Sequence, residues 1–148
     1  CTEADSEKLE GVSDVISGFT GGTTANPVYR EGKWGDHREA AQVIYDPALI
    51  SFEELVTHVY ATIDYEDLDG QFCDRGRSYS PAIYYKSEAE KLAIEKLAPE
   101  SSVVPIEPET KFYPVRTEHQ GYYKKNPMRY TFYRNRCKRD QRIKELAK

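Results

Sequence analysis

Apolar side chains recur along the chain at two spacings, one typical of helices and one typical of strands. The clearest helical pattern covers Ser51–Ile63, where apolar residues fall three or four positions apart behind a capping box. The same signals predict a second capped helix over Ser87–Ala98. Shorter apolar runs predict strands over Val12–Phe19 and Ala41–Tyr45.

The remaining segments give weaker patterns. The polar stretch Asp64–Tyr79 is expected to be a long loop, and loops of this length are often functional. Helices and strands alternate irregularly, which favours an α+β two-layer domain over a doubly wound sheet. Further helices are expected over Thr2–Leu9, Glu118–Lys125 and Arg139–Ala147, and further strands over Ser80–Tyr85, Ser102–Ile106 and Lys111–Val115.

The overall composition is ordinary for a globular domain, but the charge is unevenly distributed. Apolar residues make up 39% and charged residues 31% of 148 residues, and no apolar run approaches the ~20 residues of a membrane span. The net charge is −4, yet residues 124–148 carry ten Lys or Arg and only two acidic residues. Such a segment either binds nucleic acid or docks on its own acidic domain. Docking is favoured because apolar anchors are interleaved with the charges: Met128, Tyr130, Phe132, Tyr133, Ile143 and Leu146.

The chain has three cysteines, Cys1, Cys73 and Cys137. Their odd number and wide spacing predict neither a disulfide framework nor a metal site, so free or redox-active thiols are expected. Cys73 is expected to be a small buried apolar residue, with a third redox thiol as the alternative. Cys137 lies among basic residues, which would lower the pKa of its thiol.

The stretch Gly32–Tyr45 places Glu39 in a glycine-punctuated loop that leads into the strand Ala41–Tyr45. Desolvation at the mouth of a buried strand raises the pKa of a carboxyl group, and a proton donor near neutral pH needs such a raised pKa. The twelve tyrosines of the chain suit a pocket that is both apolar and hydrogen-bonding. The residues alone therefore indicate a candidate acid, Glu39, with phenols as candidate partners.

Taken in order, a set of short segments resembles the peptide methionine sulfoxide reductase A family, which reduces the S epimer of methionine sulfoxide. The set spans most of the chain. It comprises Gly11-Val12, Gly18-Phe19-Thr20-Gly21-Gly22, Asn26-Pro27-Val28-Tyr29, His37-Arg38-Glu39-Ala40, Tyr45-Asp46-Pro47, Gln71-Phe72-Cys73-Asp74-Arg75-Gly76, Ala82-Ile83-Tyr84-Tyr85, His119-Gln120 and Lys125-Asn126-Pro127.

The resemblance implies thiol chemistry on a sulfoxide. A cysteine thiolate in a Gly-Cys-Phe-Trp segment attacks the sulfoxide sulfur, and Glu39 gives a proton to the sulfoxide oxygen. By position, Tyr29, Asp74 and Tyr79 support that oxygen and the pocket. The cysteine becomes a sulfenic acid, and Cys137 is the candidate that resolves it as a disulfide, which thioredoxin then reduces.

The resemblance also implies a substrate, a setting and a fold. The substrate is methionine sulfoxide, free or in oxidised proteins, and neither a bound cofactor, a metal, nucleic acid nor a membrane is involved. We expect a cytoplasmic monomer with one N-terminally truncated domain over 1–148, on which the basic tail 124–148 packs. Its fold is expected to be an α+β two-layer sandwich with a mixed sheet, a ferredoxin-like core and a long, irregular C-terminal tail.

The chain departs from the family pattern at two places that matter for the site. The Gly-Cys-Phe-Trp segment is not among the 148 residues, and Cys1 falls three positions after the family nucleophile, so the nucleophile is expected upstream. The usual Gln-Tyr-Arg-Ser reads Ser78-Tyr79-Ser80-Pro81, which keeps the tyrosine and lacks the arginine. Three alternatives stay open: Cys1 as a stand-in nucleophile, a module that binds methionine sulfoxide without reducing it, and an N-terminal-nucleophile hydrolase that uses Cys1.

Overall fold

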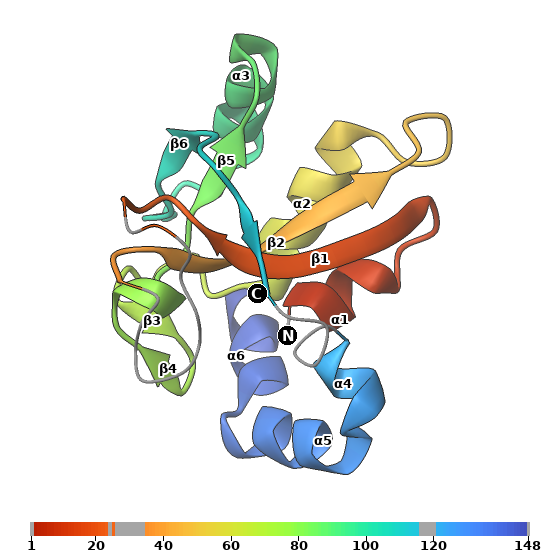
Figure 1. The fold of residues 1–148 in the computed structure, drawn as a ribbon, viewed down its shortest axis with the longest axis vertical. Helices are drawn as coiled ribbons and strands as arrows, with labels where there is room; N and C mark the ends of the chain where they lie inside the picture. Colours follow the sequence, from red (N-terminus) through yellow and green to blue (C-terminus); the bar gives the residue numbers. More distant parts are fainter. Residues whose placement is uncertain (1, 24, 26–34, 116–120, 148) are drawn as a thin grey trace.

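The computed structural model describes residues 2–23, 25, 35–115 and 121–147, and the statements below concern these residues (Figure 1). The helices are α1 Thr2–Glu7, α2 Phe52–Thr62, the 3-10 helix η2 Arg77–Tyr79, α3 Glu88–Leu97, α4 Tyr122–Lys125, α5 Pro127–Arg136 and α6 Arg139–Leu146. The strands are β1 Val12–Thr20, β2 Arg38–Tyr45, β3 Gly70–Gln71, β4 Asp74–Arg75, β5 Ile83–Tyr85, β6 Ile106–Pro108 and β7 Tyr113–Pro114.

The largest sheet described is three-stranded and antiparallel, with β1 between β2 and β7. The pairing of β1 with β2 runs from Val12 opposite Tyr45 to Phe19 opposite Glu39 and on to Thr20 opposite Arg38. Two further pairs stand apart, antiparallel β3–β4 and parallel β5–β6. The fold is therefore mixed α and β with small sheets, and the expected single mixed sheet is divided into three in the part described.

The core lies where α2 packs against α3 and the β5–β6 pair. Its fully buried member, Ile94, contacts an apolar cluster completed by Val56, Tyr60, Ile63 and Val104. Both helices begin where the sequence predicts. Ser51 Oγ accepts the Glu54 N–H at 3.1 Å, and Ser87 Oγ accepts the Glu90 N–H at 3.3 Å.

Three elements differ from the sequence-based expectations. The strand expected over Ala41–Tyr45 begins earlier, at Arg38, so Glu39 is a strand residue and not a loop residue. The loop expected over Asp64–Tyr79 contains the β3–β4 hairpin and η2. The strand expected over Ser102–Ile106 begins at Ile106, where β6 pairs with Ile83 of β5. The starts of β2 and β6 depend on pairing with distant strands, which local pattern does not reveal, whereas the β3–β4 hairpin pairs near neighbours inside the polar stretch.

Residues 124–147 are more helical than expected: the helix expected over Arg139–Ala147 is present as α6, and the stretch before it, expected to be irregular, forms α5. Asn126-Pro127 starts α5, because proline is well suited to the first helical position. None of the residues of α5, all of which the structure describes, is buried, so no apolar stripe marked this helix in the sequence. The chain reverses direction at Lys138, whose φ of 54° is left-handed, and α6 follows.

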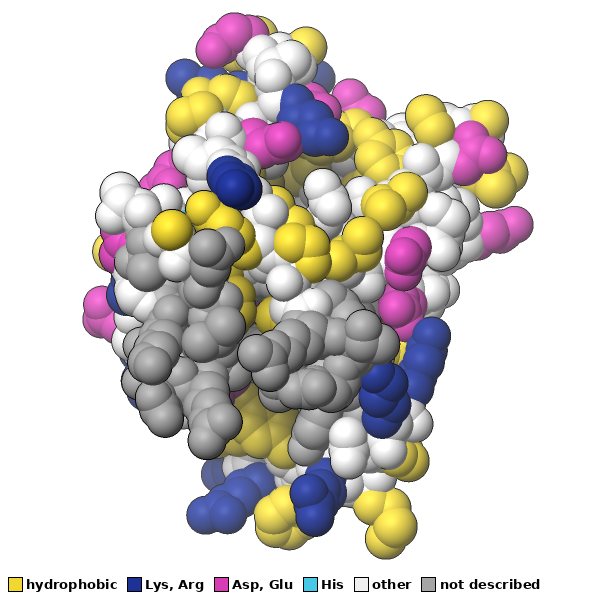
Figure 2. Space-filling model, viewed as in Figure 1, with side chains coloured by type: hydrophobic (Ala, Val, Ile, Leu, Met, Phe, Trp, Pro, Cys, Tyr) yellow, Lys and Arg dark blue, Asp and Glu magenta, His cyan; other side chains and the backbone are white. Residues whose placement is uncertain are grey.

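Charge and hydrogen bonding join α4, α5 and α6, hereafter the C-terminal helices, to the rest of the molecule. Arg134 of α5 and Arg139 of α6 both contact Asp5 of α1, at 2.9 and 3.2 Å. Arg142 contacts Asp64 at 2.9 Å. Figure 2 shows Lys and Arg side chains at the end of the molecule where these helices lie, with most visible acidic side chains farther up. No helix in the described ranges is both long and apolar enough to cross a membrane.

Candidate active site

A tight hairpin, β3–β4, forms one wall of the candidate site. Its backbone is closely packed, because a Cβ on Gly70 would lie 2.2 Å from the carbonyl oxygen of Asp74. Phe72 in the turn has a φ of 56°, in the left-handed region. The Arg139 guanidinium lies 4.5 Å from the centre of the Phe72 ring, an arrangement typical of a cation–π contact. The turn therefore presents Cys73 and Asp74 toward the C-terminal helices.

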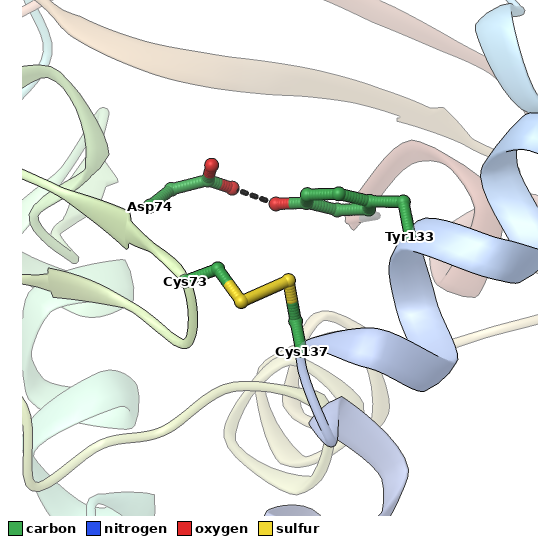
Figure 3. The surroundings of a disulfide bond; sticks show 4 residues. All are labelled: Cys73, Asp74, Tyr133 and Cys137. Carbon is green, nitrogen blue, oxygen red and sulfur yellow. Dashed lines mark hydrogen bonds between the residues drawn. A yellow bond between two sulfur atoms is a disulfide. The ribbon is translucent and has the colours of Figure 1, made fainter.

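Two bonds join this hairpin to α5 (Figure 3). Cys73 forms a disulfide with Cys137, and their Cα atoms are 5.3 Å apart, inside the usual range for disulfides. Beside it, the Tyr133 hydroxyl donates a hydrogen bond to Asp74 Oδ2. Tyr133 precedes Cys137 by four positions, so both side chains lie on one side of the helix.

The disulfide corrects the expectation for the cysteines. Cys73 is exposed and bonded, not a small buried apolar residue, and neither it nor Cys137 is a free thiol in this structure. The two are 64 positions apart in the sequence, and that separation was the reason no pairing was expected. The reverse turn at Lys138 and the contacts of Arg139 bring them together, and neither feature has a signature in cysteine spacing.

Tyr79, at the end of η2, belongs to the same cluster. Burial is the largest cause that raises its pKa, and the nearby carboxylates of Glu39 and Asp74 raise it further. The pKa of Tyr133 is raised by burial and by its hydrogen bond to Asp74, and Tyr79 adds to the shift. Both phenols therefore keep their protons at neutral pH and can donate hydrogen bonds to an oxygen.

Glu39 reaches this cluster from β2, where it pairs with Phe19 of β1. Its side chain is exposed, which differs from the desolvation expected at a buried strand mouth. The alternation of side chains along a strand explains the difference, because the preceding residue, Arg38, faces the interior and is 4% exposed. His37 is buried beside it and accepts the Gly22 N–H at Nδ1, which fixes the start of the strand.

The structure thus brings together three of the residues expected at the site, Glu39, Asp74 and Tyr79. Tyr29 and Cys1 lie outside the described residues, and Cys137 lies next to the cluster through its bond to Cys73. From the sequence, Tyr133 was expected only as an apolar anchor. Its spacing of four positions from Cys137 is the signal that could have placed it at the site. In the described part of the chain, no group of three or more His, Cys, Asp or Glu could hold a metal ion.

Comparison with known proteins gives a consistent result. The family described as peptide methionine sulfoxide reductase matches residues 1–148. Peptide methionine sulfoxide reductase MsrA 2 of Rhizobium meliloti is 41% identical over 153 residues, covering 99% of this chain and 77% of that protein. The MsrA of Halalkalibacterium halodurans is 40% identical over 154 residues, covering 97% of this chain and 88% of that protein.

A solved structure agrees with these sequence matches. Methionine sulfoxide reductase A of Corynebacterium diphtheriae superimposes with a TM-score of 0.74 at 30% identity, covering 85% of this chain and 69% of that one. The match over the whole sequence, together with the shared fold, shows that this chain belongs to the peptide methionine sulfoxide reductase family.

Proposed function

We propose that this oxidoreductase reduces methionine-S-sulfoxide, free or in oxidised proteins, to methionine, with Glu39 as the proton donor. The observation that carries the assignment of roles is the gathering of two carboxylates and two protonated phenols from four elements. Glu39 comes from β2, Asp74 from β4, Tyr79 from η2 and Tyr133 from α5. Such a cluster suits a polar oxygen that gains negative charge as the reaction proceeds.

The first chemical step needs a proton at the sulfoxide oxygen. A cysteine thiolate attacks the sulfur, and the oxygen receives a proton. The oxygen then passes from the substrate sulfur to the cysteine sulfur, which releases methionine and leaves a cysteine sulfenic acid. Glu39 supplies that proton, and Tyr79 donates a hydrogen bond to the oxygen. Glu39 is exposed without substrate, so we infer that the bound methionine side chain covers it and thereby favours its protonated form.

Asp74 acts through the phenols. Asp74 accepts a hydrogen bond from the Tyr133 hydroxyl, and its charge raises the pKa of both Tyr79 and Tyr133. Both phenols therefore stay protonated and can donate hydrogen bonds. Tyr29 completes the oxygen pocket in this proposal. In this proposal the nucleophile is the cysteine that the resemblance assigns to a Gly-Cys-Phe-Trp segment, and this segment is not among the 148 residues.

Cys137 and Cys73 complete the cycle in this proposal. Cys137 attacks the sulfenic acid, which releases water and forms a disulfide with the nucleophile. Cys73 then displaces the nucleophile from Cys137, which restores the nucleophile and leaves the Cys73–Cys137 disulfide. Cys73 is exposed, which supports attack on this disulfide by an external dithiol protein. We propose that this protein is thioredoxin. We further propose that the protein works as a monomer in the cytoplasm, where such reductants are maintained.

The test uses the chain extended at its N-terminus by its encoded upstream residues. Incubated with a methyl sulfoxide and dithiothreitol, it should form the sulfide, and Glu39→Gln should lower kcat by about 10²–10⁴-fold. Glu95→Gln, an exposed carboxylate on α3, is the matched control and should leave kcat unchanged. An extended chain without turnover would contradict the proposal, and retained sulfoxide binding in that chain would favour the binding module instead.

A further inference from the structure

One arginine is buried beside the site without being part of it. Arg38 is 4% exposed, and its guanidinium has three acceptors: Ser80 Oγ at 3.0 Å, the Tyr84 hydroxyl at 2.9 Å and Glu107 Oε2 at 3.2 Å. Arginine is rarely buried to this extent unless its donors are matched, as they are here. The guanidinium therefore ties β2 to η2 and to the β5–β6 pair.

The bond to Ser80 has a defined direction. Ser80 Oγ donates its only proton to the Arg77 carbonyl at 2.7 Å, so its lone pairs are free to accept from Arg38 Nε. Arg38 is covalently adjacent to Glu39, and Ser80 is covalently adjacent to Tyr79. A single hydrogen bond thus links the strand that carries the carboxylate to the short helix that carries the phenol.

The sequence around Tyr79 bears on why the guanidinium of Arg38 lies next to Ser80. The pattern Gln-Tyr-Arg-Ser places an arginine directly after the tyrosine, and this chain has Ser80 at that position. The structure fills the space next to Ser80 with the guanidinium of Arg38. In this chain β2 supplies the buried cation next to Ser80.

We infer that Arg38 is a positioning residue, which replaces the arginine absent at position 80 and holds Glu39 and Tyr79 at their working separation. The inference rests on the proposed function of Glu39 and Tyr79. Arg38 touches neither substrate nor reacting atoms, so its loss should lower kcat through geometry and leave KM nearly unchanged. Lysine cannot replace it, because one ammonium group does not reproduce the planar set of donors that serves three acceptors.

The experiment moves the arginine from position 38 to position 80 in the N-terminally extended chain. Arg38→Ser should lower kcat by about 10–100-fold, and adding Ser80→Arg to it should recover at least about tenfold. Ser80→Ala removes the link together with the Ser80 hydrogen bond to the Arg77 carbonyl, while Arg38 keeps Tyr84 and Glu107, and should lower kcat several-fold. Ser101→Ala, at an exposed serine that also donates a hydrogen bond, is the matched control with unchanged kcat.

A second readout does not depend on turnover. In Ser80→Ala, Tyr79 moves away from Glu39, so the phenolate absorbance assigned to Tyr79 by subtraction of a Tyr79→Phe variant should appear at lower pH than in the parent. A folded Ser80→Ala variant with unchanged kcat and an unchanged Tyr79 titration would overturn the inference. So would a folded double variant without recovery. An inactive parent chain would instead overturn the proposed function, so the two failures are distinguishable.

Discussion

Helices α2 and α3 meet through apolar side chains, whereas the C-terminal helices meet the rest of the molecule through charges and a disulfide. Ile94 is fully buried in the apolar cluster, but α5 has no buried residue and the buried residue of α6 is Arg139. Apolar burial is insensitive to thiol reductants and little weakened by salt, and the second kind of attachment is sensitive to both. The candidate site lies where the C-terminal helices meet the rest of the molecule, since Tyr133 belongs to α5 and Asp74 to β4.

The largest expected effect comes from Asp5, which the C-terminal helices share. Asp5→Asn leaves the buried Arg139 without its carboxylate and Arg134 with Asp140 alone, and should lower the free energy that holds these helices in place by about 4 kcal/mol. Amide hydrogen exchange should accelerate in α5 and α6 and stay slow in α2 and α3. Asp140→Asn is the control, because that carboxylate contacts the same Arg134 at an exposed position and should contribute less than about 1 kcal/mol. Equal acceleration in both variants would contradict the distinction.

The second prediction concerns the apolar cluster around Ile94. Ile94→Ala removes apolar contacts at a site with 0% exposure and should lower the free energy of unfolding by about 3 kcal/mol, measured by urea denaturation. Leu92→Ala on the same helix, 63% exposed, should change it by less than about 0.5 kcal/mol. If Ile94→Ala accelerated amide hydrogen exchange in α5 without changing the urea midpoint, the apolar cluster would not be the common core.

The third prediction concerns the disulfide. Cys73→Ser removes a cross-link between residues 64 positions apart and should release the C-terminal helices at a cost of about 2 kcal/mol. Trypsin should then cut the Lys- and Arg-rich segment 124–147 faster while the rest of the chain stays resistant. Treatment of the parent with dithiothreitol should reproduce this pattern. Identical digestion with and without the disulfide would show that the ion pairs alone hold the segment.

The smallest effect is a pH dependence at Tyr133. Burial and Asp74 raise its pKa above the value near 10 of an unfolded chain, so the folded protein binds this proton more tightly. The corresponding stability is complete below about pH 10 and is lost as the pH rises through the folded-state pKa. Because the side chain is only half-buried, the loss should amount to about 1 kcal/mol. The free energy of urea unfolding of Tyr133→Phe should decline less at alkaline pH, with the remainder due to Tyr79 and other phenols of raised pKa, and an equal decline in both proteins would contradict the assignment.

The sequence predicts the elements whose signals are local. Ser51 and Ser87 mark two helix starts correctly because a cap and its N–H donor lie three residues apart. The start of β2 at Arg38 depends on pairing with Thr20 of β1, which no short window of sequence contains. For the same reason the disulfide was not predicted. The β3–β4 hairpin is local but short and polar, and α5 has no buried residue, so neither gives an apolar pattern. Glu39 was predicted from its place before a buried strand, the roles of Asp74 and Tyr79 came through resemblance to a family, and their common location required the fold.

The contacts of Asp5 with Arg134 and Arg139 span 129 and 134 positions, most of the 148 residues. On the ribosome, the first helix emerges long before its cations are translated. A nascent chain therefore carries an uncompensated carboxylate until Arg134 and Arg139 have been synthesised, and closure over such a distance slows folding. An interrupted translation product would lack this closure entirely, which makes it a ready substrate for cellular proteases.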